Sequence, residues 1–204
     1  AGGSLAFLKQ RGTIRILAVF ALLTGFALSA VETYWQPALH AMQPVYWIFG
    51  AVSFSGFAFV MGGSWLAERL LRRFASRGVL LLLVLKALFG VGLILLFLPK
   101  GQPAFIAVYL LVYAFVGSGS VMENTLLNHL VPASHRAGVL SLSSLILQLG
   151  GLLAALCGYF VSTYSRYQNI WLIAGSCLLL SVLVFSLLSR RNTKKEESEE
   201  PCAS

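Results

Sequence analysis

The sequence alternates between long apolar runs and short polar segments. Each run has about the 20 residues that an α-helix needs to cross the hydrocarbon core of a bilayer. Their apolar residues are continuous rather than alternating with polar ones, as they would in a half-buried strand. Six runs are recognised, at residues 16–35, 45–66, 78–98, 104–127, 138–163 and 170–189.

Because a backbone in lipid must satisfy its own hydrogen bonds, the runs predict six membrane-spanning helices. The composition agrees, since 58% of the residues are apolar, 11% are charged and the mean hydropathy is +0.82. A soluble globular domain has about 25% charged residues. We therefore expect an all-α membrane protein. Its expected parts are a cytoplasmic N-terminal lead at 1–13, a six-helix bundle at 14–191 and a disordered cytoplasmic tail at 192–204.

The positive charge is divided unevenly between the two sides of the predicted membrane. Twelve of the Lys and Arg residues lie before the first run, in the second and fourth loops or after the last run. The remaining loops, at 36–44, 99–103 and 164–169, hold only Lys100 and Arg166. The positive-inside rule then places both termini in the cytoplasm and predicts a multi-pass protein of the cytoplasmic (inner or plasma) membrane. The net charge of +8 reflects topology, and no nucleic-acid partner is expected.

Three charged residues lie inside the runs, at Glu32, Lys86 and Glu123. A charge within a membrane helix is costly unless it is paired or hydrated, so all three are functional candidates. At about 1.5 Å per residue, Lys86 lies roughly 12 Å from the cytoplasmic end of its run and Glu123 roughly 6 Å from that of the next run. Consecutive antiparallel helices are usually neighbours, so these two residues can form an ion pair. The pair would be either a static tie or a contact that breaks during gating.

Glu32 differs because no basic residue lies at its depth. It stands close to Tyr34, Trp35 and Gln36 near the outer end of the first run. A carboxylate in this setting suits an aromatic cation site or a protonatable coupling group. The alternative is an interfacial Glu that reaches water and lipid headgroups.

Polar residues recur every three or four positions along the fourth run and therefore share one helix face. Lipid does not tolerate such a face, so we expect it to line a water-filled cavity or to pack on other helices. The face consists of Tyr109, Tyr113, Gly117, Ser120, Asn124 and Asn128, with Glu123 at its edge. On the fifth run, Gln148 is expected to form an interhelical hydrogen bond rather than to contact substrate. The candidate substrate or proton-coupling residues are Glu32, Glu123, Lys86, Tyr113, Asn124, Ser120 and Gln148.

Enzyme chemistry finds little support in the sequence. The segment VGSGSV at 116–121 superficially resembles the Gly-x-Ser-Gly of six-helix intramembrane serine proteases. Such an enzyme needs a His on a later helix, and none follows His135. The sequence also lacks an H-E-x-x-H motif and a channel filter motif. We expect no enzyme activity, catalytic residue, metal or cofactor, and keep the protease-like enzyme and the channel as alternatives.

The segment between the second and third runs, SWLAERLLRR at 64–73, resembles the cytoplasmic signature G-x-L-A-D-R-x-G-R-R of the major facilitator superfamily. Glu68 stands for the family's Asp, while Ser64 and Leu71 replace its two glycines. A second segment, VPASHRAGVLSL at 131–142, resembles the family's loop between the tenth and eleventh helices. The residues that match the signature outright are Leu66, Ala67, Arg69, Arg72 and Arg73.

This resemblance implies that the fold is one half of a major facilitator fold, the C-terminal six helices of a twelve-helix transporter. It implies alternating-access transport of a small organic solute or drug, by efflux or antiport, with coupling to an ion or a proton. The expected partners are a small-molecule substrate, membrane lipid and a second six-helix half, either a missing N-terminal half or a partner chain. A natural half-size product and a fragment both fit. The implied cytoplasmic gate residues are Glu68, Arg69, Arg72, Arg73 and Arg136.

Overall fold

The computed structural model describes residues 12–74 and 77–199. Within these ranges the chain forms six long α-helices joined by short turns, without a strand. The predicted all-α bundle is therefore confirmed. The helices are α2 (Gly12–His40), α3 (Trp47–Arg73), α4 (Gly78–Leu96), α5 (Gln102–Leu130), α6 (Ala133–Tyr164) and α7 (Asn169–Glu199).

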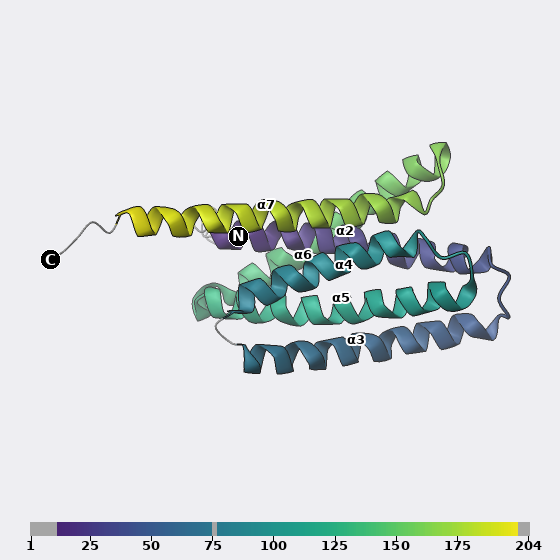
Figure 1. The fold of residues 1–204 in the computed structure, drawn as a ribbon, viewed down its shortest axis with the longest axis horizontal. Coiled ribbons are helices and arrows are strands. Elements are labelled where there is room, and N and C mark those ends of the chain that lie inside the picture. The colour runs from purple at the N-terminus through teal and green to yellow at the C-terminus, as the bar shows by residue number, and fades with distance from the viewer. Residues whose placement is uncertain (1–11, 75–76, 200–204) are drawn as a thin grey trace.

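The six helices run up and down along one long axis (Figure 1). The α3–α4 and α5–α6 turns lie at one end, which we name the basic end because it carries Arg69, Arg72, Arg73, Arg77 and Arg136. The α2–α3, α4–α5 and α6–α7 turns lie at the opposite end. Each described helix is long and apolar enough to cross a membrane. The chain is thus an integral, multi-pass membrane protein.

The helices pack as three main pairs, α3 with α5, α2 with α6 and α4 with α7. Further contacts of α4 with α5 and of α2 with α7 join the pairs into one bundle. In the α3–α5 pair, a Cβ at Gly63 would collide with the carbonyl oxygen of Ala114, three residues before Gly117. A Cβ at Gly117 would collide with the carbonyl oxygen of Val60, three residues before Gly63. The two backbones approach so closely that only glycine fits at either position.

The α2–α6 pair repeats this geometry. A Cβ at Gly25 would collide with the carbonyl oxygen of Leu147, and one at Gly150 with that of Leu22. Each carbonyl again lies three residues before the opposing glycine. Since α2 and α5 run in opposite directions, helices α2–α4 and α5–α7 are related as an inverted three-helix repeat, the arrangement found within one half of a major facilitator fold.

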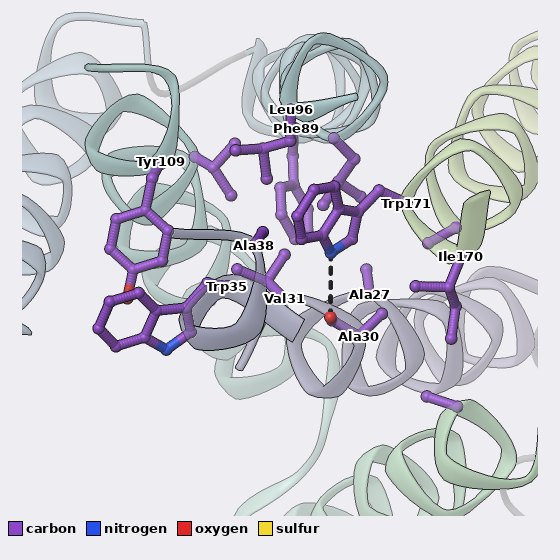
Figure 2. Close-up of a cluster of buried hydrophobic side chains, with 14 of the residues drawn as sticks. Ala27, Ala30, Val31, Trp35, Ala38, Phe89, Leu96, Tyr109, Ile170 and Trp171 are labelled. Atoms are coloured by element: carbon purple, nitrogen blue, oxygen red, sulfur yellow. Dashed lines mark hydrogen bonds between the residues drawn. The ribbon is translucent and has the colours of Figure 1, made fainter. Parts of the chain in front are cut away.

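An aromatic cluster fills the bundle in the half farther from the basic end (Figure 2). Trp171 of α7 is fully buried, and its Nε1 donates a hydrogen bond of 3.0 Å to the carbonyl oxygen of Ala30 on α2. The Trp35 ring lies 5.0 Å from that of Tyr109, centroid to centroid. This cluster ties α2, α5 and α7 together.

Helices α3 and α6 bury the least of their apolar stretches, 17% each, whereas α4 buries 50%. Their outer faces carry large apolar side chains, among them Phe54, Phe57 and Trp65 on α3 and Leu152 and Phe160 on α6. Such faces must be covered by lipid or by another membrane protein. The bundle therefore has two extensive faces that contact other molecules.

Five of the six described helices are longer than the predicted runs, α2 and α7 by the most. Helix α2 continues past Pro37 to His40, whereas the sequence predicts a loop from residue 36. Pro37 lies in the last turn, where its missing N–H costs only one helical hydrogen bond. Helix α7 continues through Glu199 and so includes residues 192–199 of the predicted tail, whose disorder stays a prediction. That segment is rich in Lys and Glu, which are good helix formers. Residues 1–11 of the predicted lead at 1–13 and residues 200–204 of the predicted tail at 192–204 lie outside the described residues.

Candidate functional site

A buried ion pair joins α4 to α5. The Nζ atom of Lys86 lies 2.7 Å from Oε1 of Glu123, and the two side chains are only 2% and 11% exposed. The ammonium is close to this oxygen without being aligned for a hydrogen bond, so the contact is ionic. The pairing predicted from the depths of the two residues is confirmed.

Lys86 has a second partner on α2. Its ammonium donates a hydrogen bond of 2.5 Å to Oγ1 of Thr24, which is also buried. Lys86 therefore connects α2, α4 and α5 at one point. Sequence reasoning missed Thr24, although a signal was present. Counted from the basic ends of their predicted spans, Thr24 and Lys86 each lie about 12 Å deep.

A cavity of about 240 Å³ lies next to this ion pair, between α2, α5 and α6. Glu123 lines the cavity, whereas Lys86 lies behind it and contributes no lining atoms. Serine hydroxyls and one amide provide most of its polar wall. The lining residues are Ala21, Ser120, Glu123, Asn124, Leu127, Leu140, Ser143, Ser144 and Leu147.

The polar face of α5 divides into two parts. Toward the basic end, Ser120 and Asn124 are exposed and line the cavity. Farther along, Tyr109 is buried and Tyr113 half-buried, with ring centroids 4.5 Å apart. Between these parts, Gly117 packs against α3. Cavity lining and helix packing were alternatives from the sequence, and each applies to one half of the face.

Glu32 lies apart from this cavity, exposed on α2. Its neighbours in sequence contact other rings: Tyr34 stacks on Tyr167 at 5.7 Å, and Trp35 packs on Tyr109. The charge of Glu32 lies within electrostatic range of the Tyr109–Tyr113 pair. The aromatic residues next to Glu32 in the sequence thus pack against rings of other elements.

Gln148 is exposed on α6, one turn beyond the cavity residue Ser144. Within the described part of the chain it makes no hydrogen bond to another helix, so that prediction is wrong. The reason is geometric, because α6 meets α2 through Gly150, two positions and about 200° around the helix from Gln148. The neighbouring Gly151 accepts the interhelical bond instead, from the hydroxyl of Ser29 at 3.4 Å.

The gate residues of α3 make contacts within their own helix end. Glu68 lies 3.9 Å from Arg72, and both side chains are more than half exposed. Such an exposed pair contributes little to stability. The guanidinium of Arg69 stacks over the Trp65 ring at 4.2 Å, and that of Arg73 lies 5.9 Å from the Phe74 ring. These residues form an exposed basic surface.

Arg136 lies at the start of α6, also at the basic end. Its Nη2 atom donates a hydrogen bond of 3.1 Å to the carbonyl oxygen of Asn128 near the end of α5. A cation near the last carbonyls of a helix interacts favourably with the helix dipole. Arg136 thus stabilises the α5–α6 turn.

The segment at 116–121, which resembles a serine-protease motif in the sequence, takes part in the packing of α5 against α3. The hydroxyl of Ser118 lies 2.9 Å from the carbonyl oxygen of Gly63 and 2.8 Å from that of Ala114, and it donates to these acceptors. It supports the close approach of α3 and α5 and points away from the cavity. Among the described residues, no cluster of His, Cys, Asp or Glu side chains is placed to hold a metal.

Comparison with known protein families extends the resemblance to nearly the whole chain. A family model described as Major Facilitator Superfamily matches residues 5–202. The matched range includes the cavity, the ion pair and the basic end. A comparison with curated proteins found no match.

Proposed function

Because the chain belongs to the major facilitator superfamily of membrane transporters, we propose that it forms the C-terminal six-helix half of a secondary transporter. The transporter moves a small organic solute or drug by alternating access. One observation carries the proposal, the polar cavity of about 240 Å³ that is bounded by a buried ion pair inside a membrane-spanning bundle. A bundle that served only as a membrane anchor would not need charged and polar side chains in its interior, where they are energetically unfavourable.

The shape of the bundle supports the assignment to one half. Its inverted three-helix repeat accounts for all six described helices and leaves no helix for a second half. In this arrangement a second six-helix bundle covers the exposed faces of α3 and α6 and closes the solute pathway between the two bundles. That bundle is either a missing N-terminal half or a partner chain.

Hydrogen-bonding groups on two helices hold the solute. Ser120 and Asn124 approach it from α5, and Ser143 and Ser144 approach it from α6. Tyr113 lies farther along the same face of α5, and Gln148 lies one turn beyond Ser144. These residues bracket a pathway from the cavity toward the opposite end of the bundle.

The Lys86–Glu123 pair acts as a static tie. Alternating access moves largely rigid bundles against each other, and both partners belong to the same bundle. The pair therefore stays intact while the pathway opens and closes. Breaking it would leave a buried charge uncompensated, at a cost of about 3 kcal/mol or more.

At the basic end, the exposed gate residues contact the second bundle when the pathway closes on that side. They are Glu68, Arg69, Arg72, Arg73 and Arg136. By the distribution of positive charge, this end and both termini face the cytoplasm of a cytoplasmic (inner or plasma) membrane.

Glu32 is the proposed proton-coupling or ion-coupling group. It is exposed, and within the described residues it has no basic partner, in contrast to Glu123. In membrane vesicles that contain the complete transporter, Glu32→Gln should abolish transport driven by a proton gradient while solute exchange continues. Glu196→Gln, which removes a carboxylate from the C-terminal segment outside the predicted spans, is the control. Gradient-driven transport by Glu32→Gln at the wild-type rate would reject this role.

The transport function itself is tested by blocking the cavity. We expect vesicles with the wild-type protein to show saturable flux of at least one solute from a panel of radiolabelled small organic compounds. Ser120→Phe should abolish that flux because the ring fills the cavity. Leu180→Phe, at an exposed position on α7 away from the faces of α3 and α6, should leave it unchanged. Equal flux in the Ser120→Phe protein would contradict the proposal.

A further inference from the structure

The cavity wall contains one ionisable side chain among the described residues that line it, Glu123. An unpaired carboxylate at this position would attract cations strongly, because low-dielectric walls leave its charge poorly screened. It would thereby make the cavity a site for organic cations. The structure, however, does not leave this carboxylate unpaired.

Lys86 neutralises Glu123 from behind the wall. Its ammonium lies 2.7 Å from the carboxylate, is almost fully buried and does not reach the cavity surface. Thr24 holds the ammonium in place from α2. The Lys86–Glu123 pair therefore acts on a solute in the cavity as a dipole with no net charge. A solute with a net charge has no counter-ion in the cavity wall.

The rest of the wall suits an uncharged solute. Ser120, Asn124, Ser143 and Ser144 can each donate and accept hydrogen bonds. The other described lining residues are aliphatic, so no aromatic ring is available to bind a cation through its π face. The cavity thus offers neutral hydrogen-bonding groups together with an apolar surface.

We propose that Lys86 sets the charge selectivity of this cavity, so that it accepts uncharged, hydrogen-bonding solutes and discriminates against organic cations. The inference rests on the proposed transport function for its site and adds the chemical class of the solute. Lys86 acts through Glu123 and is therefore a positioning residue. Removing its charge converts the cavity into a cation site, and removing the charge of Glu123 converts it into an anion site.

Three probes with the same six-carbon skeleton test this inference: neutral sorbitol, cationic glucamine and anionic gluconate. Binding of each radiolabelled probe is measured on the full chain in lipid nanodiscs, purified with any bundle that accompanies it. We expect Lys86→Met to bind glucamine at least about tenfold more tightly than the wild type does. Lys86→Arg, which keeps the charge, should retain the wild-type preference.

The reciprocal variant covers the case in which Lys86→Met fails to fold. Glu123→Gln leaves the ammonium unpaired and should raise gluconate affinity by a similar factor. Combining Lys86→Met with Glu123→Gln removes both charges and should restore the wild-type order of affinities. Lys100→Met and Glu196→Gln remove the same kinds of charge from positions outside the predicted spans and should change neither preference.

The inference is overturned if neither single variant gains affinity for its charged probe. It is equally overturned if the wild type already binds glucamine as tightly as Lys86→Met does, or if Lys100→Met shows the same gain. Because this experiment measures binding, it is separate from the flux assay. A charge switch in binding without any flux would reject the transport function alone, whereas flux without a charge switch would reject the role of Lys86 alone.

Discussion

At the residue scale, Lys86 and Glu123 are the most demanding feature of the bundle. Both side chains are largely buried, and each charge is tolerable only because the other lies 2.7 Å away. Thr24 adds a hydrogen bond that fixes the ammonium between three helices. The stability of the bundle therefore depends on keeping or removing the two charges together.

Lys86→Met should lower the free energy of unfolding by about 3 kcal/mol, since it leaves the buried Glu123 carboxylate without a partner. Adding Glu123→Gln to that variant should recover most of the loss. Unfolding in mixed detergent micelles, followed by circular dichroism, measures both effects. If the two substitutions destabilise the protein additively, the pair is not a coupled unit.

Trp171→Phe removes the indole donor that reaches the carbonyl oxygen of Ala30 and keeps most of the ring. It should cost about 1 kcal/mol, the usual net contribution of one hydrogen bond. Trp65→Phe, at an exposed position on α3, is the matched control and should cost less. The same unfolding assay compares the two, and equal losses would show that the α7–α2 hydrogen bond contributes nothing measurable.

Individual site residues were predictable where their distance along the membrane-spanning helix determines which residues they contact. Lys86 and Glu123 were paired from their positions alone, and the cavity residues Ser120 and Asn124 from their spacing. Thr24 was missed because a lone hydroxyl in an apolar span carries a weak signal. Gln148 was misplaced because the rotation of α6 depends on which glycines meet α2, and the sequence of one helix does not show that.

At the scale of helices, close glycine contacts determine how the bundle is built. The same offset of three residues relates glycine and carbonyl in both the α3–α5 and the α2–α6 pairs. These contacts fix the separation of the paired helices, and thereby the width of the cavity beside them. The existence and order of the helices followed from apolar length, whereas their exact ends did not, since helix formers continue α7 past the membrane.

Two adjacent glycines on α3 allow a matched test of this packing. A Cβ at Gly63 would collide with backbone of α5, whereas nothing lies within 4 Å of one at Gly62. Gly63→Ala should destabilise the protein by about 2 kcal/mol through overpacking. Gly62→Ala should instead stabilise it by about 0.5 kcal/mol, because alanine favours the helix. Similar effects of the two substitutions on detergent unfolding would contradict the close approach of α3 and α5.

At the scale of the whole molecule, the bundle presents more apolar surface on α3 and α6 than on its other helices. This asymmetry fits a second six-helix bundle on these faces, with the cavity between α2, α5 and α6 opening toward it. In the proposed transporter, the cavity therefore lies beside the second bundle. Its lining could be predicted in part from α5, but the serines of α6 became evident only once the helices were placed together.

The central claim is that this cavity belongs to an alternating-access pathway. It is tested most directly by asking from which side of the membrane position 124 can be reached. The measurement is the reaction of Asn124→Cys with a membrane-impermeant thiol reagent, in right-side-out and inside-out vesicles containing the complete transporter. Cys157, Cys177 and Cys202 are first replaced by alanine. Lys100→Cys and Arg77→Cys mark the two sides, and each should react from one side only.

We expect Asn124→Cys to react from both sides, in proportions that change when solute is added. Reaction from a single side under all conditions would contradict the claim.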